Sequence, residues 1–172
     1  MKVLVTYLSN SGNTEKLAKA IFDGVEGEKM LRPMKEVDDT SGYDMLFVGF
    51  PVIAKGAPRR AKKFLSRHAQ GKKVALFVTH GMPATMDMLV PMLDNCWTAA
   101  QGSQLVGRMD CQGKLAGWMA SAFRLYPNAE VRRWVRAGGE SIGEGHPGSE
   151  DLARAKDFGH SLTADNAQTI VG

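Results

Sequence analysis

Residues 9–14 read Ser-Asn-Ser-Gly-Asn-Thr, a run of short polar side chains around one glycine. The apolar run 2–8 precedes them, and a helix pattern starts at Thr14. A turn from a strand into a helix presents backbone N–H groups at the positive end of the helix dipole, which favours an anion. Gly12 lets the backbone approach a ligand closely. Side-chain hydrogen-bonding groups stand at Ser9, Ser11, Asn13 and Thr14.

The loop carries no Lys or Arg, so it would hold a phosphate through neutral hydrogen bonds. It matches neither GxxxxGK nor GxGxxG, which makes a nucleoside triphosphate or a dinucleotide a poorer ligand than one terminal phosphate. The alternative is a helix cap with nothing bound. A cap needs only one such residue, whereas this loop has several.

Strands and helices alternate along the rest of the chain. Apolar runs predict strands at 2–8, 28–34, 43–52, 72–80 and 103–111. A first helical pattern begins at Thr14. Further helical patterns cover 58–69, 85–100, 114–126, 128–138 and 149–165. Pro91 either kinks the 85–100 helix or lies in its first turn, and Ser149 is the expected N-cap of the last helix.

This alternation predicts an α/β fold with a parallel sheet and helices on both faces. About ten residues separate the second and third strands, which is short for a crossover helix, so we expect a reduced helix or an extended loop there. Ligands of such sheets bind beyond the carboxyl ends of the strands. The segments at those ends are 9–14, 51–58, 79–85 and 110–114.

The chain resembles the flavodoxin family at these positions. "SNSGNT" is similar to the [ST]-x-[ST]-G-N-T phosphate loop of that family, and "VGFPVIAKGAP" and "LFVTHGMPAT" resemble its two ring-binding loops. "CQGK" and "GHPGSEDLARAKDF" are similar to a subgroup of short flavodoxin-like proteins. The resemblance implies one flavodoxin-like domain over residues 1–172, a three-layer sandwich with strand order 2-1-3-4-5, noncovalent FMN and electron transfer.

The resemblance also assigns candidate FMN-binding residues. The phosphate loop is Ser9, Asn10, Ser11, Gly12, Asn13 and Thr14. One side of the flavin ring would face Pro51, Val52, Ile53, Ala54, Lys55 and Gly56. The other side would face Thr79, His80, Gly81 and Met82. In such carriers a backbone carbonyl after the third strand turns toward the ring, and either Gly56 or the Ala54–Lys55 peptide would allow this.

Two departures from the family stand out. The ring loops hold no Trp or Tyr, so Val52, Ile53 and Met82 would pack on the ring. The family is usually acidic around the flavin, whereas this chain carries a net charge of +4. Lys55 is either a cation near the ring, where it would stabilise an anionic reduced flavin, or a solvated loop lysine.

Three other residues near the expected site could have either a chemical or a structural role. His80 either donates a proton to the flavin or a substrate, or fixes its own loop through hydrogen bonds. Cys111 borders the expected pocket, where a plain buried thiol is favoured, and Asp110 reads as a loop cap. The tryptophans Trp97, Trp118 and Trp134 lie in helical patterns and are expected to pack.

The basic charge gathers in the predicted helix 58–69. At helical spacing, Arg59, Arg60, Lys62, Lys63 and Arg67 share one face, and Ala61, Phe64, Leu65 and His68 share the other. The basic face is either solvated or a docking surface for an acidic partner protein. No stacking aromatics are interleaved and no recognition motif is present, so nucleic acid is not expected.

Composition places the chain among ordinary globular proteins, with 44% hydrophobic and 23% charged residues over 172 positions. No apolar run approaches the roughly 20 residues of a membrane span, and the start of the chain is too short for a signal-peptide core. The two cysteines, Cys96 and Cys111, have no metal-binding spacing. We therefore expect a cytoplasmic protein with free thiols.

Three functions remain open. The favoured one is an FMN-binding electron carrier that serves redox partner proteins. The second is an FMN-dependent reductase of a small molecule such as a quinone or a tetrapyrrole. The third is a non-catalytic FMN-binding module of a larger complex.

Overall fold

Five parallel strands form the centre of the computed structural model, which describes residues 1–115, 121, 124–138 and 143–164. The strands are β1 (Lys2–Tyr7), β2 (Glu28–Pro33), β3 (Met45–Pro51), β4 (Lys73–His80) and β5 (Gln104–Gln112). Their order is β2-β1-β3-β4-β5, with every pair parallel. The predicted α/β class and strand order are confirmed.

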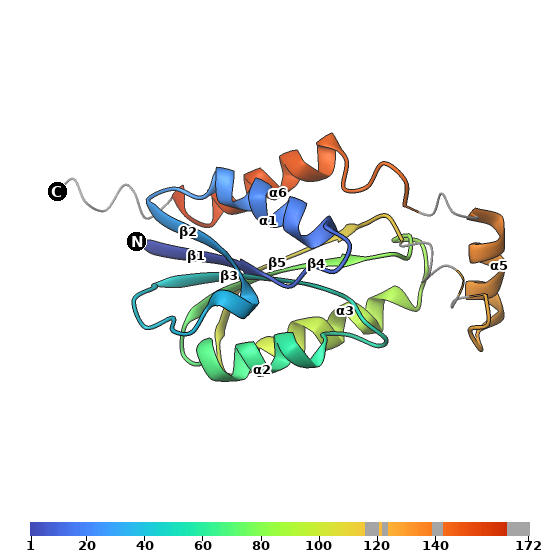
Figure 1. The fold of residues 1–172 in the computed structure, drawn as a ribbon, viewed down its shortest axis with the longest axis horizontal. Coiled ribbons are helices and arrows are strands. Elements are labelled where there is room, and N and C mark those ends of the chain that lie inside the picture. The colour runs from blue at the N-terminus through green and yellow to red at the C-terminus, as the bar shows by residue number, and fades with distance from the viewer. Residues whose placement is uncertain (116–120, 122–123, 139–142, 165–172) are drawn as a thin grey trace.

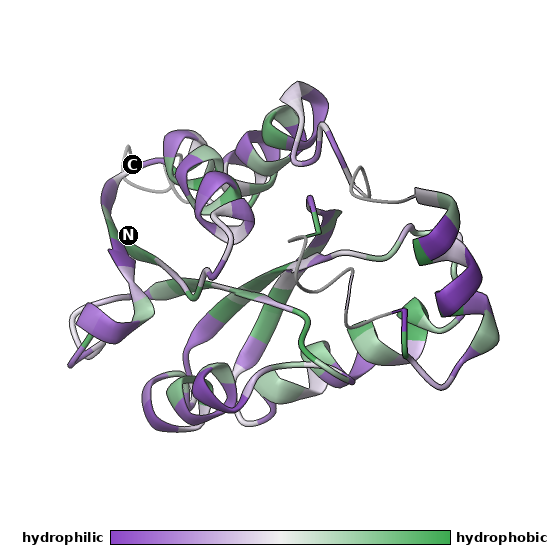
Figure 2. Cartoon of the chain, turned by 45° about the vertical axis from the view of Figure 1, so that its right-hand side comes forward, coloured by the Kyte–Doolittle hydropathy of each residue, from purple (hydrophilic) through white to green (hydrophobic). Residues whose placement is uncertain are grey.

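The apolar strand sequences follow from burial on both faces. All residues of β3 except Pro51 are buried, as are all residues of β4 except Lys73. Such strands need apolar side chains on both sides of the pleat. Figure 2 shows hydrophobic residues concentrated along these central strands.

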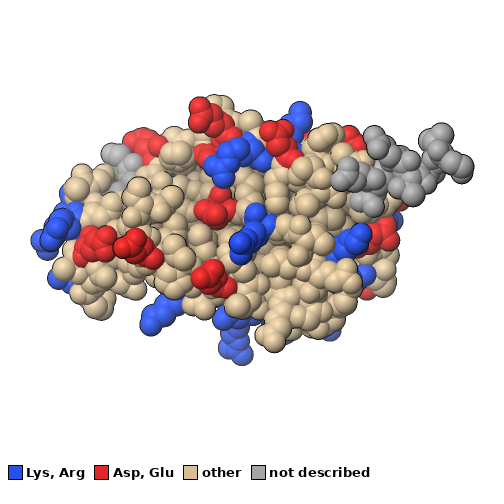
Figure 3. Space-filling view, turned by 180° about the vertical axis from the view of Figure 1, so that it is seen from behind, with Lys and Arg blue, Asp and Glu red and all other residues tan. Residues whose placement is uncertain are grey.

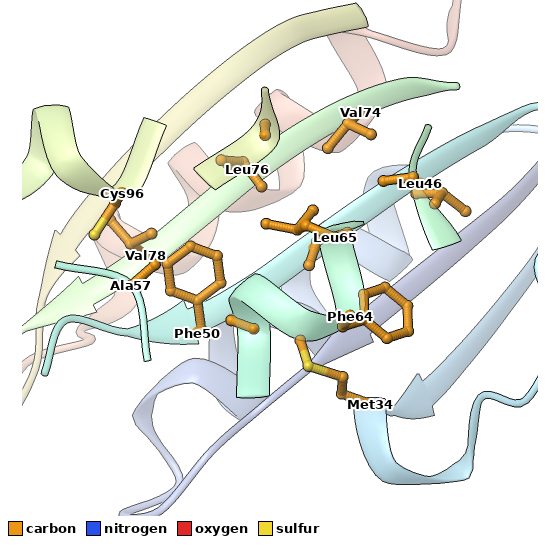
Figure 4. Packing of buried hydrophobic residues seen from close by; sticks show 14 of the residues in the cluster. Met34, Leu46, Phe50, Ala57, Phe64, Leu65, Val74, Leu76, Val78 and Cys96 are labelled. Carbon is orange, nitrogen blue, oxygen red and sulfur yellow. The ribbon is translucent and has the colours of Figure 1, made fainter. Parts of the chain in front are cut away.

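Helices cover the two faces of the sheet, giving the three layers expected (Figure 1). On one face lie α1 (Asn13–Gly24) and α6 (Ser149–Ser161); on the other lie α2 (Arg59–His68) and α3 (Leu89–Trp97), which continues into the short η2 (Thr98–Ala100). Figure 4 shows the core beneath α2, where Phe64 and Leu65 point toward the sheet. On the opposite face, α1 and α6 pack on a second core cluster.

Two glycines let α1 and α6 approach each other closely. A Cβ atom on Gly24 would lie 1.9 Å from the carbonyl oxygen of Lys156, and one on Gly159 would lie 2.3 Å from that of Ile21. No side chain fits at either position, so backbone meets backbone across this helix pair.

The connection from β2 to β3 is short, as predicted. Only the 3₁₀ helix η1 (Met34–Glu36) and a loop span it. Met34 is buried against the α2 face of the sheet, so this brief turn still contributes to the core. No crossover helix of the usual length could fit into so few residues.

The predicted amphipathic helix is confirmed as α2. Ala61, Phe64 and Leu65 are buried, while all five cations on the helix are exposed.

Several predicted helix boundaries were wrong. The 85–100 helix begins at Leu89, because residues 83–88 form turns, and Pro91 lies in its first turn rather than at a kink. The N-cap of α6 is Gly148, not Ser149, and the Asp151 carboxylate accepts the Gly148 N–H at 2.9 Å. That helix ends at Ser161 rather than 165.

The segment between β5 and α6 is only partly described. The helix predicted at 128–138 is confirmed as α5 (Ala129–Gly138). The helix predicted at 114–126 falls largely on 116–120 and 122–123, outside the described residues, and so does part of the 139–148 loop. Within the described ranges, no helix is both long and apolar enough to cross a membrane.

Candidate functional site

The carboxyl ends of β1, β3 and β4 meet at one edge of the sheet, and hydrogen bonds continue between the segments that follow them. The Leu8 N–H donates to the Gly49 carbonyl at 2.8 Å, and the Val52 N–H donates to the Thr79 carbonyl at 2.7 Å. The structure therefore brings together three of the four segments that the sequence singled out.

The loop 9–14 forms a tight turn into α1. Gly12 is the N-cap with φ at +86°, a left-handed conformation that favours glycine. Open space surrounds the position of an added Cβ there, so backbone conformation rather than crowding requires the glycine. The Gly12 N–H donates to Ser9 Oγ at 3.1 Å. Asn10 and Ser11 are exposed, and the first turn of α1 directs its free N–H groups to this loop.

Two of the predicted phosphate-loop side chains turn inward. Asn13 is buried, and its amide nitrogen donates to the Lys114 carbonyl at 2.9 Å. Asn13 thereby ties the loop to the segment after β5. Thr14 is also buried, and its Oγ1 lies 2.8 Å from Thr79 Oγ1. One hydroxyl pair thus connects the phosphate loop with the end of β4.

The loop after β3 is a two-residue hairpin. Ile53 and Gly56 exchange both backbone hydrogen bonds, at 2.9 and 3.2 Å. Ala54 stands at the corner with φ at +56°, an uncommon conformation for a residue with a Cβ. The Lys55 carbonyl accepts the Asn95 amide at 2.9 Å. A Cβ on Gly56 would lie 2.8 Å from Asn95 Cβ, so this glycine permits close packing on α3.

The segment after β4 is held by His80. Its Nδ1 lies 2.6 Å from the Met82 carbonyl, which can only accept, so Nδ1 carries a hydrogen. Its Nε2 lies 3.2 Å from a carboxylate oxygen of Asp110. The hydrogen bond with His80 is the main reason why the pKa of Asp110 lies below its ordinary value. Gly81 follows, where a Cβ would lie 2.5 Å from Leu115 Cδ1.

The residues expected to pack on a flavin ring lie in different environments. Ile53 is 41% exposed at the hairpin, and Lys55 is exposed beside it. Val52 and Met82 instead belong to a methionine-rich cluster that also contains Tyr126 and Trp134. The aromatic residues that the ring loops lack are therefore supplied next to them by the segment around α5.

Sequence reasoning missed three features of this site: the Thr14–Thr79 hydroxyl pair, the His80–Asp110 pair, and the cluster that Tyr126 and Trp134 share with Val52 and Met82. The apolar stripe of Val131, Trp134 and Val135 at helical spacing was the available signal for the last of these. Nothing in the sequence pairs the residues of the other two, because they come from elements that are distant along the chain.

The two cysteines are buried. Burial is the main cause that raises the pKa of each thiol to about 12. The nearby Asp151 carboxylate adds to the effect at Cys111. Both side chains are therefore neutral thiols near neutral pH and have little nucleophilic character.

The donor set around residues 9–14 fits a phosphate group. The loop itself holds hydroxyls, amides and backbone N–H groups but no carboxylate. The adjacent Glu15 is neutralised by Lys19, 2.7 Å away. A monoester dianion at this point would meet the positive end of α1 and no fixed negative charge.

The strand order and the meeting of these loops at the carboxyl edge of the sheet define a doubly wound α/β protein. The model of the flavodoxin domain matches residues 4–160, so the chain belongs to the flavodoxin family. Members of this family typically bind FMN.

Individual flavodoxin-like proteins are similar to this chain in sequence or in fold. The flavodoxin-like domain-containing protein BilS of Clostridioides difficile (strain CD3) is 29% identical, over 94% of this chain and 96% of BilS. A flavodoxin from the domain Archaea superposes with a TM-score of 0.59 at 20% identity, over 96% of this chain and 98% of that one. A flavoprotein from Lactobacillus acidophilus NCFM, solved in complex with FMN, gives a TM-score of 0.50 at 19% identity, over 63% and 92%.

Proposed function

We propose that this protein binds FMN and acts as an electron carrier between redox proteins. The phosphate would bind the loop Ser9–Thr14. The ring would lie between the hairpin Pro51–Gly56 and the segment Thr79–Met82. FMN supplies one- and two-electron redox chemistry when bound, and the protein supplies its position and electrostatic surroundings.

The observation that carries the proposal is the state of His80. Both of its ring nitrogens already face protein acceptors, the Met82 carbonyl and the Asp110 carboxylate. A side chain held in this way orients its loop and has no free N–H for a substrate. Electron transfer between proteins needs no such donor, whereas reduction of a small molecule usually needs a proton delivered to it.

The hairpin supports the same function. Gly56 is held by two hydrogen bonds to Ile53 and by its packing on Asn95. Within the described part of the chain, no hydrogen bond to the Ala54 carbonyl is formed. The Ala54–Lys55 peptide, rather than Gly56, is therefore the part of this loop that can reorient toward a ring.

The basic helix α2 supplies a surface for an acidic partner. Among the described residues, none of its five cations forms an ion pair with a carboxylate. Complementary charge raises the rate of encounter between proteins more than it raises affinity. Arg59 and Lys62 are exposed on the outer side of this helix and would meet the partner.

A second candidate function is an FMN-dependent reductase of a small molecule. The methionine-rich cluster favours it, because Tyr126 and Trp134 pack near Val52 and Met82. Partial cover over a ring would suit a bound substrate better than direct contact with a protein partner.

Stepwise anaerobic reduction with dithionite, followed by mixing with acceptors, separates the two functions. A carrier should show one-electron steps, seen as a long-wavelength absorbance band, and should pass electrons to an acidic one-electron protein acceptor such as cytochrome b5. Reduction in a single two-electron step, with rapid reoxidation by a quinone and none by that acidic acceptor, would favour the reductase. Absence of FMN binding in calorimetry would contradict both.

A further inference from the structure

A groove opens on the side of the phosphate loop that faces α2. Its volume is about 520 Å³, within the usual range of small-molecule sites. One wall is the chain that leaves β1, from Tyr7 to Asn10; the other walls are η1 with its flanks and one side of α2. The ring loops 51–56 and 79–82 do not line it.

The rim of the groove is cationic. Lys35, Arg60, Lys63 and Arg67 line it, and none of the described residues lining it is Asp or Glu. Only Lys35 has a carboxylate nearby, Glu36 at 3.9 Å. Arg60 stands in the first turn of α2, where the helix dipole disfavours a cation and no acidic residue compensates. On the face seen in Figure 3, by contrast, acidic and basic side chains are interspersed.

The floor of the groove is apolar. Leu8 and Val37 are half-buried, and Met34 and Phe64 are buried. Figure 4 shows Met34 and Phe64 side by side at the margin of the core. The His68 ring lies against Phe64, with 4.9 Å between the ring centroids. Apolar surface framed by cations, of which Arg60, Lys63 and Arg67 form no ion pair within the described part of the chain, suits a ligand with an apolar body and anionic ends.

The spacing of the arginines sets the length of such a ligand. Arg60 and Arg67 are seven residues apart on α2, which corresponds to about 10 Å along a helix. We propose that this groove binds an extended organic dianion whose two anionic groups lie about 10 Å apart on an apolar body. The site is distinct from the proposed FMN site and adjoins it at Ser9 and Asn10.

Biphenyl-4,4′-dicarboxylate is a suitable probe, because its carboxyl groups have this separation. Its about 18 non-hydrogen atoms, at the efficiency usual for drug-sized ligands, correspond to a Kd of about 0.1 mM. Calorimetry on the full chain, with and without FMN, should give saturable binding in that range. Biphenyl-4-carboxylate should bind more weakly and biphenyl-4,4′-dimethanol weakest, since each carries less charge. Citrate, which has charge but no apolar body, should also bind more weakly.

Two double variants with equal charge change provide the decisive comparison. Arg60→Gln with Arg67→Gln alters the groove, while Arg59→Gln with Lys62→Gln alters cations outside it. An exposed ion pair contributes up to about fivefold in affinity, so the first variant, which removes two, should weaken dicarboxylate binding by about 5- to 25-fold. The second should change it less than about twofold. Unchanged thermal melting and FMN affinity in both would show that neither variant is misfolded.

Three outcomes would overturn the proposal. Equal weakening by the two variants would indicate general attraction to a basic helix, as expected of a protein-docking surface alone. Citrate binding as tightly as the dicarboxylate would mean that the apolar floor takes no part. A Kd above about 5 mM for every probe would mean that there is no small-molecule site. None of these results depends on whether the protein carries electrons.

Discussion

The hydroxyl pair between Thr14 and Thr79 makes a directional prediction about phosphate binding. Their oxygens are 2.8 Å apart, and both side chains are buried. Each hydroxyl has a single hydrogen to donate. If Thr14 donates to the FMN phosphate, it must accept from Thr79, so the order of donation is Thr79 to Thr14 to phosphate.

This order of donation predicts different losses of FMN affinity for two isosteric variants. Thr14→Val removes a hydrogen bond to a charged group, worth about 1.5–3 kcal/mol, so FMN affinity should fall about 12- to 160-fold. Thr79→Val removes only the neutral bond behind it, which the protein already forms without FMN, so the loss of FMN affinity should be smaller and stay below about 12-fold. Riboflavin lacks the phosphate, so its affinity should stay unchanged in both. Calorimetric titration of the apoprotein with each flavin measures these differences.

Thr6→Val is the matched control. Thr6 is fully buried on β1. In the described part of the chain, its Oγ1 is the buried side-chain oxygen that has no hydrogen-bond partner. Removing an unpaired buried hydroxyl should leave FMN affinity unchanged and stabilise the fold by up to about 1 kcal/mol. Equal losses for FMN and riboflavin, or a larger effect of Thr79→Val than of Thr14→Val, would refute the proposed order of donation.

Three further predictions concern single residues. Ala54→Gly should raise the free energy of unfolding by up to about 1 kcal/mol in urea titrations, because relief of the left-handed backbone exceeds the entropy added to the unfolded chain; a loss of stability would contradict the hairpin geometry. The Cys111 thiol, with its pKa raised to about 12, should resist Ellman's reagent in the native protein at pH 8, and stability should decline as pH rises from about 9 toward 12. The pKa of Asp110 is lowered in the fold, so wild-type stability should decline as pH falls below about 4, and Asp110→Asn should flatten that decline in acid titrations of unfolding.

The strand order and the meeting of the loops at one edge of the sheet were predictable because local signals agree with the fold. Buried parallel strands require unbroken apolar runs, and the turn at Gly12 requires a residue that tolerates a left-handed backbone. The position of Pro91 allowed a first-turn location as well as a kink, and the structure selects the first turn. The N-cap of α6 was misplaced by one residue, because Gly148 takes that position and the carboxylate of Asp151, the third residue of the helix, accepts its N–H.

The details of the candidate site were less predictable. Thr79 meets Thr14 only because α1 begins over the end of β4, and His80 meets Asp110 only because β4 and β5 adopt a particular register. Phosphate-loop composition suggested that every polar side chain serves the ligand, yet Asn13 serves the loop after β5. The cationic groove needed both η1 and α2 in place before its shape could be seen.

The glycine contact between α1 and α6 bears on the order of events when a flavin binds. Where backbone meets backbone at Gly24 and Gly159, neither helix can move closer to the other, because no side chain lies between them that could repack. The phosphate loop leads into the same helix and is tied by Asn13 to the Lys114 carbonyl and by Thr14 to Thr79, whereas the hairpin at Ala54 is a surface turn with exposed residues at its tip. We therefore expect the phosphate to find a preformed receptor and the ring loops to adjust afterwards. Recognition would begin at the end of the ligand farthest from its redox chemistry.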